Sequence, residues 1–174
     1  MQKYRLNLYH IDMKYIRDLA KADDRVMSVS PQIGKEKRPF VGIVILCESK
    51  KYCIPLTSPK PKHLTMKNDK DFTRMFDKNG KMIGCLNFNN MIPVSDSVLS
   101  PVNMKLHPEM REHERKYVSL LNDQLDWCNE NQEAIIRKAE KLYRLITENP
   151  DKLPLLTKRC CDFIRLETVL STRY

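Results

Sequence analysis

The hydrophobic pattern divides the chain into two halves. In the first half, short apolar runs alternate with polar turns, and the run 40–46 is rich in β-branched residues. Such runs are typical of β-strands, whereas strict alternation indicates a strand buried on one face. We therefore predict strands at about 4–8, 40–46, 51–56, 82–88 and 91–94. Asp12 can cap a short helix through about Lys21, with Tyr15, Ile16 and Leu19 on one face.

After Pro101 the apolar residues recur at helical spacing instead. Leu121, Leu125 and Cys128 form one series, and the segments 135–146 and 155–170 repeat the pattern. We predict three helices here, with the neighbouring charged residues on a solvated outer face: Glu133, Arg137, Lys138 and Lys141. The fold class is α+β, a small antiparallel barrel or curled sheet with helices packed outside. We expect one domain, 1–174, with a core in 1–100 and a helical extension in 101–174.

Charge favours a polyanionic partner. The 174 residues carry a net charge of +9, and residues 24–80 hold twelve Lys and Arg against six Asp and Glu. Clustered cations gain affinity for nucleic acid by releasing counterions from its phosphates. A membrane surface is a weaker alternative, because the basic residues are not gathered on one amphipathic helix. Residues 24–39 are expected to form a basic loop and 57–80 a long polar connection with a small helix or a function of its own.

Several other classes of protein find little support. The six cysteines lie in apolar stretches without the paired spacing of a zinc site, so we expect them reduced and buried. With four glycines, the chain has no phosphate-binding or dinucleotide fingerprint. No apolar run is long enough to span a bilayer, and no secretory segment opens the chain, which predicts a cytoplasmic protein.

The strongest candidate for chemistry is the segment Thr57-Ser58-Pro59-Lys60. It places two hydroxyls and an ammonium at a predicted strand end, beside a basic loop that contains Arg38. Spacing alone favours a turn stiffened by prolines. The alternative is a phosphodiester site, in which hydroxyls hold the phosphate and the cations offset its charge. His63 stands alone in sequence and is expected on the surface.

Four blocks of sequence resemble one protein family. They are Met13–Ile16, Arg38–Val44, Tyr52–Lys60 and Leu86–Val94, and the string Pro-Leu-Thr-Ser-Pro-Lys at 55–60 is the most specific. In this order they resemble the ToxN/AbiQ family, the endoribonuclease toxins of type III toxin–antitoxin systems. The likeness reverses the preference for a simple turn at Thr57–Lys60.

The resemblance implies an SH3-like barrel similar to the MazF and Kid toxins. It also implies RNA cleavage without metal or cofactor, leaving a 2′,3′-cyclic phosphate. The family's catalytic positions fall on Thr57, Ser58, Lys60 and Arg38, where Arg38 replaces the usual lysine. A guanidinium does not deprotonate in proteins, so Arg38 can only stabilise charge. Lys60 could carry a proton if burial beside Arg38 made its ammonium easier to deprotonate.

The family also implies an RNA partner, an antitoxin cut from tandem repeats and folded into pseudoknots, in a hetero-oligomeric assembly that acts against phage. Tyr15 matches a position near the family's RNA groove, and packing in the core is its alternative role. Basic residues outside the motif could follow the RNA backbone, namely Lys35, Lys37, Lys51, Lys62, Lys67 and Lys70. A noncatalytic nucleic-acid-binding module is the competing function, but it has no need of Thr57–Lys60 beside Arg38.

Overall fold

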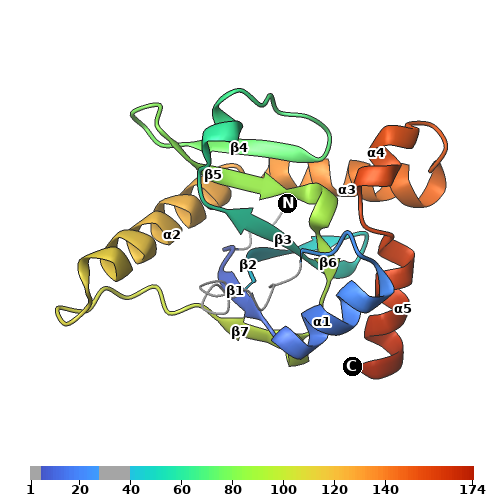
Figure 1. Ribbon diagram of the computed structural model, residues 1–174, viewed down its shortest axis with the longest axis horizontal. Coiled ribbons are helices and arrows are strands. Elements are labelled where there is room, and N and C mark those ends of the chain that lie inside the picture. The colour runs from blue at the N-terminus through green and yellow to red at the C-terminus, as the bar shows by residue number, and fades with distance from the viewer. Residues whose placement is uncertain (1–4, 28–39) are drawn as a thin grey trace.

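The protein is built around one antiparallel sheet, as Figure 1 shows for the computed structural model, which describes residues 5–27 and 40–174. The strands are β1 (Leu8–Ile11), β2 (Val41–Cys47), β3 (Lys50–Thr57), β4 (Phe72–Phe76), β5 (Met82–Asn87), β6 (Ile92–Pro93) and β7 (Leu99–Pro101). The helices are α1 (Met13–Ala22), α2 (Glu112–Glu130), α3 (Gln132–Glu148), α4 (Pro154–Arg159) and α5 (Phe163–Arg173). Short 3₁₀ turns occur at Pro61–Leu64, Phe88–Asn90 and Asp96–Val98.

The sheet is open. Its strands follow the order β4-β5-β3-β2-β1-β7, with β6 paired to β3 beside this path. Within the described part of the chain, the outer strands β4 and β7 do not pair with each other. The mixed architecture with an antiparallel sheet is as predicted, but these strands do not close into the expected barrel. The likeness to MazF and Kid stays a prediction.

Strand β3 lies at the centre of the sheet and changes partners along its length. On one edge it forms a hairpin with β2, from Cys47 opposite Lys50 to Gly42 opposite Pro55. On the other edge it pairs first with β6 and then, at Leu56 and Thr57, with β5. The last residue of β3, Thr57, therefore lies between the start of β2 on one edge and the middle of β5 on the other.

The helices follow the predicted pattern with one difference. Helix α1 begins after Asp12, whose side chain accepts a hydrogen bond from the Tyr15 backbone N–H at 2.9 Å. The predicted helix 155–170 is instead two helices, α4 and α5. The chain turns between them because the Cys161 N–H donates to the Asn89 carbonyl, and Asp162 then caps α5. A hydrogen bond to a distant residue interrupts a pattern that looks continuous in sequence.

The predicted connection 57–80 contains a strand that the sequence pattern did not reveal. Strand β4 spans five residues, and only Phe72 and Met75 in it are buried. The ladder with β5 also shifts register between Met75 and Phe76. A strand this short without period-two burial has no clear signature in sequence.

The helices cover the sheet from several sides (Figure 1). Helix α2 packs on β5, α3 on β2, and α5 on β6, and α1 and α5 lie side by side. The core runs continuously through the sheet and these helices. All six cysteines are buried and free, as predicted. Among the described helices, none is long and apolar enough to cross a membrane.

A carboxylate joins the beginning of β3 to two helices. Glu167 of α5 accepts hydrogen bonds from the hydroxyls of Tyr52 and Tyr143, both at 2.7 Å, and from Lys50 Nζ at 2.7 Å. Burial tends to raise the pKa of Glu167, but these hydrogen bonds outweigh it and hold the pKa below its usual value. The ionised form of Glu167 is therefore the one that stabilises this junction.

We expect this junction to weaken in acid. Because the pKa of Glu167 is lower in the folded than in the unfolded chain, its stabilisation is present above about pH 4.5 and is lost as pH falls through the lower folded value. Thermal unfolding at pH 7 and at pH 3–4 measures the effect. The wild-type Tm should fall more between these pH values than that of Glu167→Gln. Parallel acid curves for the two proteins would contradict this role for the carboxylate.

Candidate functional site

The candidate site begins at Thr57, the last residue of β3. Its hydroxyl accepts a hydrogen bond from Asn87 Nδ2 at 3.4 Å, and Cys85 lies opposite Thr57 across the ladder. Its carbonyl accepts from Gln124 Nε2 of α2 at 3.5 Å, and the same amide donates to the Ile83 carbonyl at 2.8 Å. Gln124 is fully buried. The end of β3 is thus fixed from both β5 and α2.

Immediately after Thr57 the chain leaves the sheet and its side chains become exposed. Ser58 and Lys60 both face solvent, and no described residue forms an ion pair with Lys60. Thr57 therefore ends the strand, and Ser58 and Lys60 follow it in an exposed segment; their joint role as a site stays a prediction. Lys60 is exposed, and Arg38, beside which it was expected to be buried, lies outside the described residues.

His63 fixes the backbone of this segment through two hydrogen bonds with Lys60. The Lys60 N–H donates to His63 Nδ1 at 3.1 Å, and the His63 N–H donates to the Lys60 carbonyl at 2.9 Å. The ring is only 4% exposed and lies against Phe72, with ring centres 5.8 Å apart. The expectation of a surface histidine is wrong, because β4 supplies an apolar wall that the sequence pattern did not reveal.

The contact requires a neutral imidazole. Burial, with smaller contributions from the charges of Lys62 and Lys60, lowers the pKa of His63. At neutral pH, Nδ1 is therefore free of a proton and accepts the Lys60 N–H, whereas a protonated ring has no acceptor. Since the folded pKa lies below 6.5, the contact is present above this pH and is lost as pH falls through the folded value.

Replacing His63 should separate positioning from chemistry. For the RNA cleavage that the resemblance implies, we expect His63→Ala to lower the rate about tenfold, a loss of about 1.4 kcal/mol, because the Lys60 backbone loses its acceptor. His63→Asn offers an amide oxygen near the position of Nδ1 and should retain most of the activity. The decline of activity in acid should also be shallower in His63→Asn than in wild type. If His63→Asn is as inactive as His63→Ala, the ring has a role other than accepting this hydrogen bond.

Arg74 was not anticipated from sequence. Arg74 lies opposite Cys85, which lies opposite Thr57, so all three side chains project from one face of the sheet. Two strand spacings separate the backbones of Thr57 and Arg74 by about 10 Å. The Arg74 guanidinium donates to the His63 carbonyl at 3.4 Å, and its buried Nε has no hydrogen-bond partner among the described residues. Arg74 therefore places a second cation on the face that carries Thr57.

The other predicted site residues are dispersed. Tyr15 is fully buried, and its hydroxyl donates to the Pro93 carbonyl at 2.6 Å. Lys51 lies six residues before Thr57 in β3, on the order of 20 Å along the strand, and pairs with Asp96. Lys62, Lys67 and Lys70 are exposed along the connection after Lys60. Arg38, Lys35 and Lys37 lie outside the described residues.

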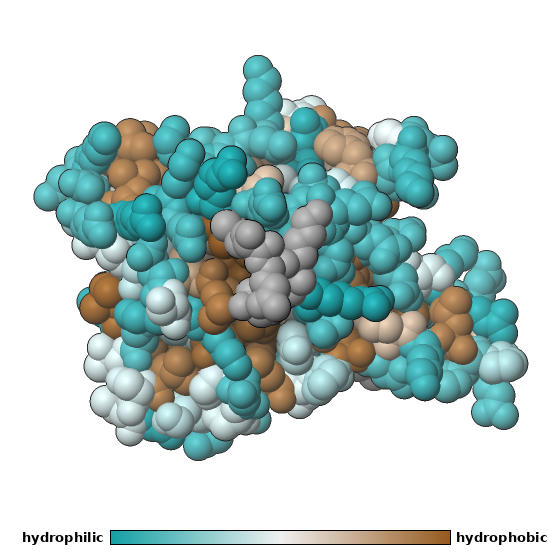
Figure 2. All heavy atoms as spheres, turned by 180° about the vertical axis from the view of Figure 1, so that it is seen from behind, coloured by the Kyte–Doolittle hydropathy of each residue, from teal (hydrophilic) through white to brown (hydrophobic). Residues whose placement is uncertain are grey.

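One face of the molecule is mainly polar. Figure 2 shows the face opposite to Figure 1, where hydrophilic side chains predominate and apolar ones form separate patches. The large exposed apolar residues come from different elements, for example Leu46, Met66, Leu106 and Leu155. Such a surface suits a charged polymer in water better than the acyl chains of a bilayer. Among the described residues, no three His, Cys, Asp or Glu side chains converge as a metal site would require.

Comparison with known proteins identifies relatives along almost the whole chain. A family model described as toxin ToxN of type III toxin–antitoxin systems matches residues 7–171. The curated endoribonuclease ToxN of Bacillus thuringiensis subsp. kurstaki is 31% identical over 165 residues, which cover 90% of this chain and 78% of the relative.

Solved structures agree with these matches. The structure of AbiQ, described as a lactococcal anti-phage endoribonuclease of a type III toxin–antitoxin system, is 25% identical and superposes with a TM-score of 0.81 over 97% of both chains. A type III toxin described as selectively inhibited by a non-coding RNA pseudoknot is 28% identical, with a TM-score of 0.78 over 97% of both chains. Together with the family match, these likenesses show that the chain belongs to the ToxN family of type III toxin–antitoxin toxins.

Proposed function

We propose that this protein is an endoribonuclease toxin whose cutting centre is the end of β3. The observation that carries the proposal is the exposed pair Ser58 and Lys60, directly after Thr57 on a backbone that His63 and Gln124 hold in place. Rigidly placed donors beside a cation are what a phosphodiester needs as charge develops on its oxygens. The family relatives named as endoribonucleases support the same reaction.

The reaction uses a nucleophile that belongs to the RNA. The ribose 2′-hydroxyl attacks the adjacent phosphorus and loses its proton, while the bond from phosphorus to the 5′-oxygen breaks and that oxygen gains a proton. The products are a 2′,3′-cyclic phosphate and a 5′-hydroxyl, and no metal takes part. Most of the rate must then come from alignment and charge stabilisation.

The residues divide this work by their chemistry. Ser58 and Thr57 donate hydrogen bonds to the non-bridging oxygens, and Lys60 neutralises the charge that grows on them. Arg38, three residues before β2, is the second cation of the proposal and acts only through its charge. Arg74 adds positive potential from the same face of the sheet.

The test is cleavage of a mixed RNA by the purified protein in EDTA, followed by mapping of both ends. We expect cuts that leave a 2′,3′-cyclic phosphate and that disappear when the nucleotide before the cut is 2′-O-methylated. Cuts that require Mg²⁺ would contradict the mechanism. RNA that is bound but never cut would make the protein a noncatalytic binding module.

The proposal includes an RNA antitoxin and a cytoplasmic, anti-phage role. The solved relative inhibited by an RNA pseudoknot supports a similar partner here, in a hetero-oligomeric assembly of protein and RNA. Tandem repeats directly upstream of the gene, followed by a terminator, would supply this RNA. Co-expression of the protein with that array should relieve growth arrest, and the two should elute together in size-exclusion chromatography. Growth arrest that persists with the array present would contradict the antitoxin role.

A further inference from the structure

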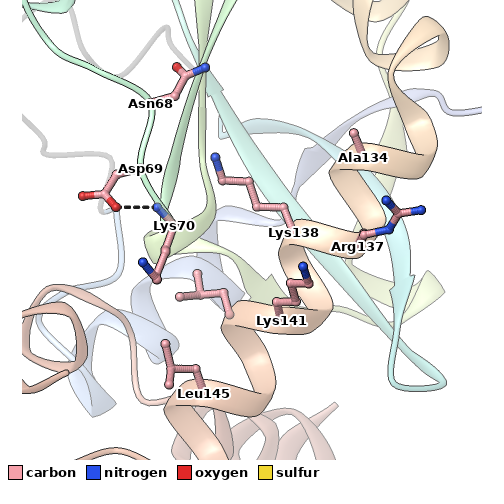
Figure 3. Close-up of a pocket in the computed structure, with 9 residues that line it drawn as sticks. Asn68, Asp69, Lys70, Ala134, Arg137, Lys138, Lys141 and Leu145 are labelled. Atoms are coloured by element: carbon pink, nitrogen blue, oxygen red, sulfur yellow. Dashed lines mark hydrogen bonds between the residues drawn. The ribbon is translucent and has the colours of Figure 1, made fainter. Parts of the chain in front are cut away.

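A hollow lies between α3 and the connection that precedes β4. Its volume is about 600 Å³, and its walls are residues 68–70 of the connection and the side of α3 from Ala134 to Leu145. Figure 3 shows Lys70 on one wall and Lys138 and Lys141 on the other. We call this hollow the α3 groove.

The floor of the α3 groove is apolar. Ala134, Leu142 and Leu145 line it together with the aliphatic stems of the lysines. Leu142 is buried in the core, whereas Ala134 is exposed. A small inorganic anion would leave this floor uncovered, so the shape and polarity fit a ligand that has a flat apolar part as well as a charge.

The rim of the α3 groove is positive. Lys70, Arg137 and Lys141 are exposed and form no ion pair within residues 5–27 and 40–174. The lining contains one carboxylate, Asp69, which lies 3.9 Å from Arg159 and accepts a hydrogen bond from the Lys70 backbone N–H. The cations of the rim are therefore available to an anionic ligand.

Lys138 fixes the shape of the α3 groove. Its ammonium donates to the Phe72 carbonyl at 3.0 Å and to Thr73 Oγ1 at 2.6 Å, and lies 5.5 Å from the centre of the Phe88 ring. The solvated outer face predicted for this residue is therefore wrong. These contacts join α3 to β4, and the third N–H of the ammonium has no hydrogen-bond acceptor among the described residues.

We propose that the α3 groove binds one nucleotide, with the base on the apolar floor and the phosphate between Lys70 and Lys141. The proposal rests on the proposed function, since it makes the groove a second point of attachment for an RNA chain. Residues 58–71 form one connection, with Ser58 and Lys60 at its start and the groove wall near its end. An RNA strand that follows this connection can contact both places.

Binding is measured with RNA that cannot be cut. The probe is a fluorescein-labelled decanucleotide that is 2′-O-methylated throughout, and anisotropy is recorded at several salt concentrations. Arg137→Glu/Lys141→Glu alters the rim, and Ala134→Trp fills the floor without changing charge. Lys105→Glu/Lys152→Glu is the matched control, because it makes the same charge change at exposed lysines elsewhere. Thermal unfolding verifies that each variant is folded.

We expect the rim variant to weaken binding about tenfold and to lower the slope of log K against log salt by about 0.7, the value for one lost phosphate contact on a single strand. Ala134→Trp should weaken binding several-fold and leave the slope unchanged. The control should change affinity by less than about threefold. Equal losses in the rim variant and the control, or unaltered binding by Ala134→Trp, would overturn the proposal.

Calorimetry with adenosine monophosphate and with inorganic phosphate identifies the source of the nucleotide. If adenosine monophosphate binds and Ala134→Trp abolishes this binding, the groove accepts free mononucleotides as well as RNA. If only the decanucleotide binds, the groove is specific for RNA. Phosphate that binds as well as the nucleotide would refute a base on the floor. If the protein cuts RNA but the rim and floor variants bind normally, only the proposal of a nucleotide in the α3 groove is refuted. If the variants lose binding as expected but the protein does not cut RNA, only the proposed function is refuted.

Discussion

Ser58→Ala should lower the rate of RNA cleavage by about 10²- to 10³-fold, the loss seen when one donor to a developing oxyanion is removed. The Ser58 side chain is exposed and forms no hydrogen bond with another described residue. Its removal should therefore leave the free energy of unfolding within about 0.5 kcal/mol of wild type. The measurement is single-turnover cleavage of a labelled RNA, together with urea unfolding.

Two sets of variants sharpen this result. Ser100→Ala removes an exposed hydroxyl elsewhere, in β7, and should cleave RNA like wild type. Lys60→Arg keeps the charge but cannot release a proton, so its comparison with Lys60→Ala separates the two roles of Lys60. If Lys60 only neutralises charge, Lys60→Arg should retain activity that Lys60→Ala loses. Normal cleavage by Ser58→Ala would refute the assignment of this strand end as the cutting centre.

The parts of the fold that could be predicted from sequence are those with local signals. Asp12 before an amphipathic segment gives α1, and the β-branched run before Cys47 gives β2. The closure of the sheet is different, because it depends on whether β4 and β7 meet, which no local pattern records. The break between α4 and α5 likewise depends on a hydrogen bond from Cys161 to Asn89, far away in the chain.

The candidate site shows the same division. Thr57, Ser58 and Lys60 are contiguous, so a motif can reveal them. His63 and Arg74 become part of the site only because β4 folds back beside β5 and buries the imidazole against Phe72. Lys138 has the periodicity of a solvated helix face, but periodicity does not tell which strand lies across from it. The signal that sequence does offer for β4 is the pair of apolar residues Phe72 and Met75 within the polar connection, which marks a short element able to bury a neighbouring polar side chain.

Gly84→Ala should be the most damaging small substitution at the site. Gly84 lies in β5 with φ of +149°, a conformation that residues with a side chain rarely adopt. A methyl group there would overlap Gln124 Nε2 and the Thr57 carbonyl oxygen, which meet beside the glycine. Neither neighbour can move freely, since Gln124 is buried and also bonded to Ile83. The substitution must therefore push α2 away from the end of β3.

We expect Gly84→Ala to lower the free energy of unfolding by about 2–4 kcal/mol, the range for overpacking combined with backbone strain. Cleavage should also fall at temperatures where the variant is fully folded, because Thr57 is displaced. Gly80→Ala is the control: its φ of +78° gives backbone strain, but nothing lies within 4 Å of the added carbon. Urea unfolding of both variants, with cleavage assayed well below Tm, separates the causes. If Gly84→Ala is as stable and active as Gly80→Ala, the contact between Gln124 and Thr57 does not hold the cutting centre in place.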